Sequence, residues 1–171
     1  MNQLAHATAK ETYDETAEMG ASSVVLPITR SDDQRIEALL EVAVSQLAPG
    51  GTIHLVHVFS PLAFGDSVSR LRFDPDARPA PDTIAERHRS IVYADQQLNE
   101  MTDGPSPNTS VHGVISDETQ SGILSVVEDV GAEHLIVGGR KRSPTGKVIF
   151  GSTAQSLLLT APCPVTFVRG P

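Results

Sequence analysis

The chain has 171 residues, of which 39% are hydrophobic, which suffices for one domain with a buried core and excludes wholesale disorder. Its 21 acidic against 13 basic side chains give a net charge of −8, which argues against double-stranded nucleic acid as the main partner. The single cysteine, Cys163, excludes an internal disulfide framework. No apolar run spans a membrane and no secretory signal opens the chain, so we expect a soluble, cytoplasmic protein.

The first third of the chain predicts a tail, a strand and a helix. Residues 1–21 are polar and lack periodicity, so they are expected to form an N-terminal tail. The apolar run 24–28 predicts a strand buried on both faces, and Pro27 marks where its pairing stops. Ser31 and Gln34 then form a capping box, and apolar residues recur at helical spacing as far as Leu47, before Pro49.

The middle of the chain predicts a second strand, a long loop and a second helix. The strand is expected from Ile53 to Val58. Residues 60–82 are rich in proline and aspartate, which predicts a long, irregular, variable loop. Thr83 with Glu86 predicts the start of a helix that runs to Asp103-Gly104-Pro105 (residues 103–105).

The last part continues the alternation of strands and helices. It predicts a strand at 109–115, a helix at 118–130 capped by Gly131, a strand at 134–137, a helix from Ser152 to Pro162 and a strand at 165–168. Alternating strands and amphipathic helices predict an α/β domain over residues 22–169, built on a five-stranded parallel sheet with helices on both faces.

A basic segment follows the fourth predicted strand. Residues 134–171 contain no acidic residue and five basic ones, Arg140, Lys141, Arg142, Lys147 and Arg169. Ligands of such sheets bind at the carboxyl ends of the strands, and Gly138 and Gly139 stand there. Gly151-Ser152-Thr153 opens a helix, whose free N–H groups attract anions. Spacing alone leaves two interpretations open, a phosphate site or a simple turn and helix cap among solvated cations.

The sequence gives little sign of other kinds of functional site. Gly146-Lys147 is followed by Val148, so there is no P-loop, and no G-x-G-x-x-G follows a strand, which argues against a kinase or motor ATPase. His54 and His57 are predicted on opposite faces of one strand, so they do not chelate one metal. Cys163 stands between two prolines and is expected to pack rather than react.

The C-terminal residues resemble a known family. Gly138 and Gly151-Ser152 stand at the first and last positions of the pattern G-x2-G-x9-G-S/T, and Ala161-Pro162-Cys163-Pro164-Val165 with Val168-Arg169 matches a characteristic ending. This resembles the nucleotide-binding branch of the universal stress protein (UspA-like) family, and the element order of residues 22–169 matches as well. The resemblance implies a Rossmann-like fold of the adenine nucleotide α-hydrolase-like type that binds ATP, with Mg²⁺ as a possible companion. The implied nucleotide contacts are Pro27, Ile28, Thr29, Val58, Val137, Gly138, Arg140, Lys141, Gly151, Ser152, Thr153 and Ala154.

Two positions differ from the family pattern. Thr29-Arg30-Ser31 replaces an Asp-Gly-Ser sequence, so a hydroxyl is expected where the family has a carboxylate. Lys141 replaces the middle glycine, and its side chain can either crowd a phosphate or bind it.

The resemblance also implies an assembly and limits the chemistry. It implies a homodimer through the last strand, Val165–Val168, and at most slow ATP hydrolysis, since neither a general base nor a metal cluster is visible. Two alternatives stay open. One is a stress protein that binds no nucleotide and acts through protein contacts of the tail or the 60–82 loop. The other is an enzyme that cleaves or transfers AMP.

Overall fold

The computed structural model describes residues 20–29, 32, 35–74, 76–101, 106–139 and 151–169. Several expectations fall outside these residues: the tail before residue 20, the capping box of Ser31 and Gln34, the helix stop at residues 103–105, and the basic loop with Arg140 and Lys141. Within the described part, no helix is both long and apolar enough to cross a membrane.

Strands and helices alternate along the chain as predicted. Their bounds are β1 (Ala21–Pro27), α2 (Ile36–Gln46), β2 (Leu47–Phe59), α3 (Pro61–Arg70), α4 (Pro81–Ala85), α5 (Arg89–Met101), β3 (Asn108–Ile115), α6 (Thr119–Asp129), β4 (His134–Gly139), α7 (Ser152–Thr160) and β5 (Val165–Arg169). Gly131 ends α6 with a φ of 59°, in the left-handed region that glycine adopts without steric cost.

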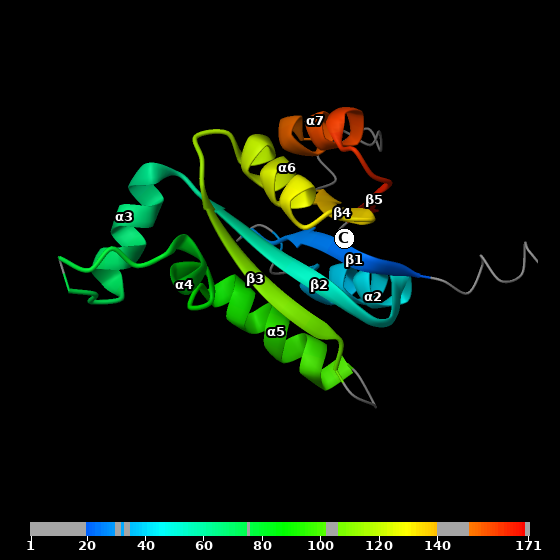
Figure 1. Ribbon diagram of the computed structural model, residues 1–171, viewed down its shortest axis with the longest axis horizontal. Helices are drawn as coiled ribbons and strands as arrows, with labels where there is room; N and C mark the ends of the chain where they lie inside the picture. Colours follow the sequence, from blue (N-terminus) through cyan, green and yellow to red (C-terminus); the bar gives the residue numbers. More distant parts are fainter. Residues whose placement is uncertain are drawn as a thin grey trace, which may run out of the picture.

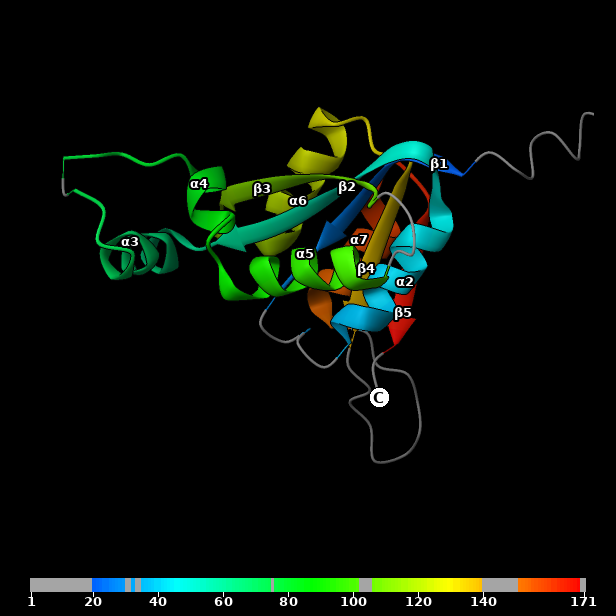
Figure 2. The same ribbon diagram turned by 90° about the horizontal axis from the view of Figure 1, so that it is seen from below.

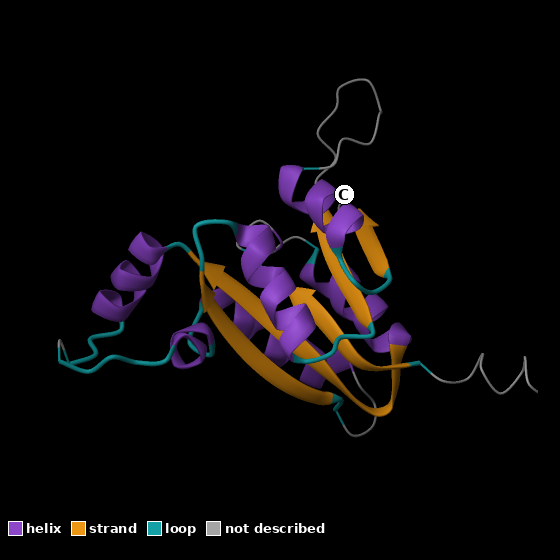
Figure 3. Cartoon of the chain, turned by 45° about the horizontal axis from the view of Figure 1, so that its top comes forward, coloured by secondary structure: helices purple, strands orange, loops and turns teal. Residues whose placement is uncertain are grey.

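The strands form one parallel sheet in the order β3-β2-β1-β4-β5 (Figure 3). This confirms the predicted fold class. The chain first builds outward from β1 through β2 to β3, and then returns to place β4 on the other side of β1. The order therefore reverses between β1 and β4, which is where ligands bind in open sheets of this kind.

Two hydrophobic layers hold helices against the two faces of the sheet (Figure 1). On one face, residues of β1 and β2 pack with α2 and α5, and Figure 2 shows these two helices in front of the strands. On the other face, Val25, Val56 and Val137 pack with residues of α6 and α7. Because side chains alternate along a strand, each strand supplies both layers.

The segment after β2 differs from its prediction as an irregular loop. Residues 61–70 form the helix α3, which projects from the rest of the molecule (Figure 1). Ser60 provides the N-cap, because its hydroxyl accepts from the N–H of Ala63 at 3.2 Å, and Pro61 occupies the first turn. Pro61, one of the prolines that suggested a loop, therefore stands at the start of a helix.

The expected single helix from Thr83 is also wrong, because two helices form. The short α4 begins at Pro81, and the Asp82 carboxylate accepts from the N–H of Gly113 on β3 at 2.7 Å. The N–H groups of Arg87 and His88 then bond carbonyls three residues back, at 3.2 and 2.9 Å. This tighter turn separates α4 from α5, so tertiary anchoring on β3 overrides the local pattern.

Two smaller differences concern β2 and α7. β2 begins at Leu47, which pairs with Ala21, whereas the helical spacing had included Leu47 in the preceding helix. α7 ends at Thr160, two residues before Pro162, and its Leu158 is 37% exposed while its neighbour Leu157 is buried.

Candidate functional site

The end of β1 is a sharp, buried corner. The N–H of Ile28, which is fully buried, donates to the carbonyl of Val56 at 2.8 Å and so continues the pairing beyond Pro27. The chain then turns at Thr29, where the N–H of Asp32 donates to the Thr29 carbonyl at 3.0 Å. This turn places the side chain of Asp32 back against the strand end.

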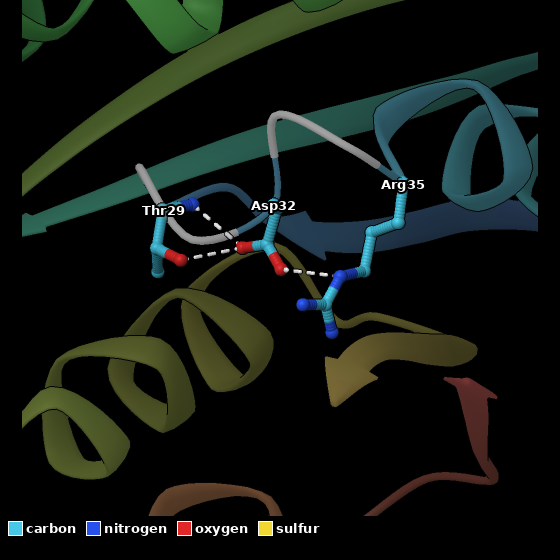
Figure 4. A network of polar contacts seen from close by, with 3 residues as sticks. All are labelled: Thr29, Asp32 and Arg35. Carbon is cyan, nitrogen blue, oxygen red and sulfur yellow. Dashed lines mark hydrogen bonds and ion pairs between the residues drawn. The ribbon is translucent and has the colours of Figure 1, made fainter. Parts of the chain in front are cut away.

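The carboxylate of Asp32 organises this corner (Figure 4). Its Oδ2 accepts from the N–H of Thr29 at 2.9 Å and from the Thr29 hydroxyl at 2.6 Å. Its Oδ1 lies 3.5 Å from Nε of Arg35, and both charged side chains are less than a tenth exposed. Hydrogen bonds to an ionised acceptor are among the stronger ones, so this network fixes the conformation of the first loop.

The same carboxylate reaches the end of β4. A Cβ placed on Gly138 would lie 2.9 Å from Oδ1 of Asp32 and 3.1 Å from Cδ of Arg35. Gly138 is therefore required here by close approach between the two loops, since a larger residue would displace the buried pair. The structure thus joins Thr29 and Gly138, two predicted site residues from distant parts of the sequence, through a residue that was not predicted.

The hydroxyl expected at position 29 is present, and a carboxylate stands beside it. The carboxylate comes from Asp32, three residues after Thr29, and the Thr29 hydroxyl donates to it. The sequence held a signal for this pair, because Asp32 and Arg35 are spaced as an i, i+3 ion pair at the start of the first helix.

The start of α7 supplies the other predicted donors. Gly151 is the N-cap with extended backbone, and no side chain in the described part of the chain caps the helix. Ser152 is exposed, Thr153 is half-buried and Ala154 is 7% exposed, so the two hydroxyls lie at the surface while Ala154 anchors the helix in the core. The uncapped N–H groups and the helix dipole favour an anion here.

Val58 and Val137 face the layer formed with α6 and α7. Both belong to that layer, and the Val58 methyls lie 2.9 and 3.1 Å from where a Cβ on Gly122 of α6 would stand. Arg140 and Lys141 lie outside the described residues.

The histidines of β2 face opposite sides of the sheet, as predicted. Nδ1 of His54 lies 2.9 Å from Nε2 of His112, whereas the Nδ1–H of His57 donates to the Ile28 carbonyl at 2.8 Å. Burial, and to a lesser extent the neighbouring His112, lower the pKa of His54. Burial raises the pKa of the half-buried Cys163 thiol, which favours packing over reactivity. Among the described residues, no three His, Cys, Asp or Glu side chains group as a metal site.

Comparison with known proteins shows the family to which the chain belongs. The model of the universal stress protein family matches residues 21–169. The chain belongs to the universal stress protein family. A universal stress protein of Mycolicibacterium smegmatis is 45% identical over 47 residues, which is 28% of this chain and 36% of that protein.

Solved structures of universal stress proteins share the fold. One described as a complex with cAMP superposes with a TM-score of 0.57 at 13% identity, covering 89% of this chain and 99% of that one. Another, from Archaeoglobus fulgidus and described as a complex with dAMP, gives a TM-score of 0.53 at 19% identity, covering 87% and 96%. At sequence identities of 13% and 19%, the structural similarity shows that this chain shares the fold of these proteins.

Proposed function

We propose that this universal stress protein binds an adenine nucleotide, ATP or a close relative, between the ends of β1 and β4. The observation that carries the proposal is the joining of Thr29 and Gly138 through Asp32 at the reversal of strand order. The α7 N-terminus adds free N–H groups and the hydroxyls of Ser152 and Thr153. That two proteins of this fold are described as complexes with cAMP and dAMP supports the ligand class.

In this proposal the residues have distinct roles. Pro27, Ile28 and Thr29 supply the corner, and Val58 and Val137 supply apolar surface beside it. Gly138 leaves room for the Asp32–Arg35 pair that fixes the first loop, and Gly151 to Ala154 donate to phosphate and ribose. Arg140 and Lys141 add positive charge, and Mg²⁺ is a possible companion of ATP. Asp32 positions the first loop.

Calorimetry with ATP, ADP, AMP and cAMP, with and without Mg²⁺, tests the proposal. Loss of two phosphate hydrogen bonds at roughly 1 kcal/mol each predicts that Ser152→Ala with Thr153→Val weakens binding about tenfold or more. Ser45→Ala is the matched control, because Ser45 is an exposed helical serine whose hydroxyl donates to the Val42 carbonyl of its own helix. Absence of binding at millimolar nucleotide would defeat the proposal.

The role of Lys141 in binding and the rate of ATP turnover are tested in the same preparation. If Lys141 binds phosphate, Lys141→Gly weakens ATP binding, whereas tighter binding would show that the side chain obstructs the site. We propose binding without fast turnover, so ATP should persist during incubation. Conversion to ADP or AMP at ordinary enzyme rates would instead favour the AMP-transfer alternative.

A stress protein that acts through protein contacts is the second candidate. The helix α3 buries none of its residues, and its Leu62 is 77% exposed. An exposed apolar side chain on a projecting helix suits a protein partner. Failure of every nucleotide to bind would favour this alternative.

We propose further that two copies pair through β5. Among the described strands, β5 lies at one edge of the sheet, and no other described strand pairs with its outer side. Val165→Pro removes one outward N–H, because the backbone of Val165 faces outward while the Pro164 carbonyl bonds β4, and it introduces a ring into the edge. Light scattering should show a dimer in the wild type and a monomer in this variant, and a monomeric wild type would exclude the pairing.

A further inference from the structure

A hollow lies under α3, apart from the proposed nucleotide site. It consists of two adjoining cavities of about 390 and about 320 Å³, which share Ser67, Arg70 and His88. Its walls are α3, the end of β2 and the turn between α4 and α5. Cavities of a few hundred Å³ suit small-molecule ligands.

Positive charge gathers around this hollow although the chain as a whole is acidic. Arg70, Arg87 and Arg89 line it, and Asp66 is the one carboxylate among the lining residues of the two cavities. In the described part of the chain, none of these three guanidinium groups forms an ion pair. The planar fork of a guanidinium matches phosphate oxygens, and several of them around one cavity favour a dianion.

One wall of the hollow is aromatic and apolar. The rings of His57 and His88 stack with their centroids 3.8 Å apart, and Phe59 meets His57 edge-on at 4.6 Å. Ile84, which is 1% exposed, packs with Phe59 in the core cluster that backs this wall. A ligand body with little charge can pack here while its anionic group meets the arginines.

The position of Arg87 is supported by packing. Its guanidinium carbon lies 4.9 Å from the ring centroid of Phe73. A cation held over an aromatic face loses less rotational freedom on binding an anion.

The hollow lies on the opposite face of the sheet from the one on which the side chain of Val58 packs. His57 and Phe59 flank Val58 on β2, so their side chains point to the opposite face. Val58 packs with α6 and α7, whereas Phe59 packs with Ile84 and Ala85 of α4. Among the described residues, the linings of the two cavities contain none of the proposed nucleotide contacts, and the hollow touches that site only where His57 donates to the Ile28 carbonyl.

We propose that the hollow binds a second ligand, a small organic phosphate, with its phosphate on Arg70, Arg87 and Arg89 and its body against the His57–His88 stack. This ligand is recognised independently of the nucleotide. The inference therefore stands or falls separately from the proposed function.

Amide NMR of the full chain, titrated with ribose 5-phosphate, tests the proposal. The expected shifts fall on residues 67–71 and 87–90, while uncharged ribose causes none. Arg70→Gln with Arg87→Gln should weaken this binding at least tenfold. The matched control is Arg78→Gln, which also removes one arginine but lies outside the lining of both cavities.

Each result of these titrations either supports or overturns the proposed phosphate site. Shifts at 67–71 and 87–90 that the double variant abolishes and Arg78→Gln preserves support the site. The proposal is overturned by no shift at 20-fold molar excess up to about 10 mM, by shifts confined to residues 138 and 151–154, or by equal affinity in the double variant. Ser152→Ala with Thr153→Val should leave the binding unchanged, which separates this site from the nucleotide site.

Discussion

Replacing Asp32 by asparagine tests whether the buried network at the end of β1 holds the two loops together. The substitution preserves the size of the side chain and one carbonyl oxygen that can still accept from Thr29. It removes the negative charge and places an amide N–H₂ beside Nε of Arg35, where Oδ1 now lies at 3.5 Å. Two donors then face each other at a site that is less than a tenth exposed.

The magnitude follows from these contacts. Each hydrogen bond from Thr29 loses its charge assistance, at about 0.5–1 kcal/mol apiece. Breaking a buried ion pair costs about 3–5 kcal/mol at ideal geometry, and the longer 3.5 Å separation reduces this to about 1–2 kcal/mol. We expect Asp32→Asn to lower the free energy of unfolding by about 2–4 kcal/mol.

Urea unfolding of the single and double variants measures this energy. Arg35→Met removes the partner, and the double variant with Asp32→Asn should cost less than the sum of the two single changes, by about 1 kcal/mol. Glu41→Gln, an exposed charge change on α2, should have an effect of less than about 0.5 kcal/mol. A loss below about 0.5 kcal/mol for Asp32→Asn, or strict additivity in the cycle, would refute the reasoning.

Two further predictions concern packing and pH. Gly139→Ala would drive its Cβ into the ring of Phe167 and lower the free energy of unfolding by about 1–3 kcal/mol. In Gly65→Ala the new Cβ meets nothing within 4 Å, so this variant should stabilise α3 by up to about 1 kcal/mol. Thermal unfolding distinguishes the two variants, and equal effects would contradict the geometry. Because burial and His112 lower the pKa of His54 in the folded state, the unfolded chain takes up a proton first as the pH falls below about 6.5, so stability should fall toward pH 5. His54→Gln should flatten that fall in urea titrations at pH 7.5 and 5.5, and an unchanged slope would count against this assignment.

The sequence alone was sufficient for the fold class, and it supplied the candidate residues of the site. The apolar run at 24–28 and the helical spacing of α2 and α6 are local patterns, which burial in a parallel sheet enforces. Gly138 and Gly151 were predicted from their spacing, because close backbone approach and a helix N-terminus restrict the residue type at each position.

Tertiary structure decided what depends on contacts between distant segments. Asp82 anchors α4 on β3 and so divides one expected helix into two, and Ala21 draws Leu47 out of helical spacing into β2. Asp32 was missed because its role arises only when the strand order brings Gly138 of β4 beside the end of β1. Local patterns record which face of an element is buried, but the partner of a buried charge is set by the arrangement of the whole sheet.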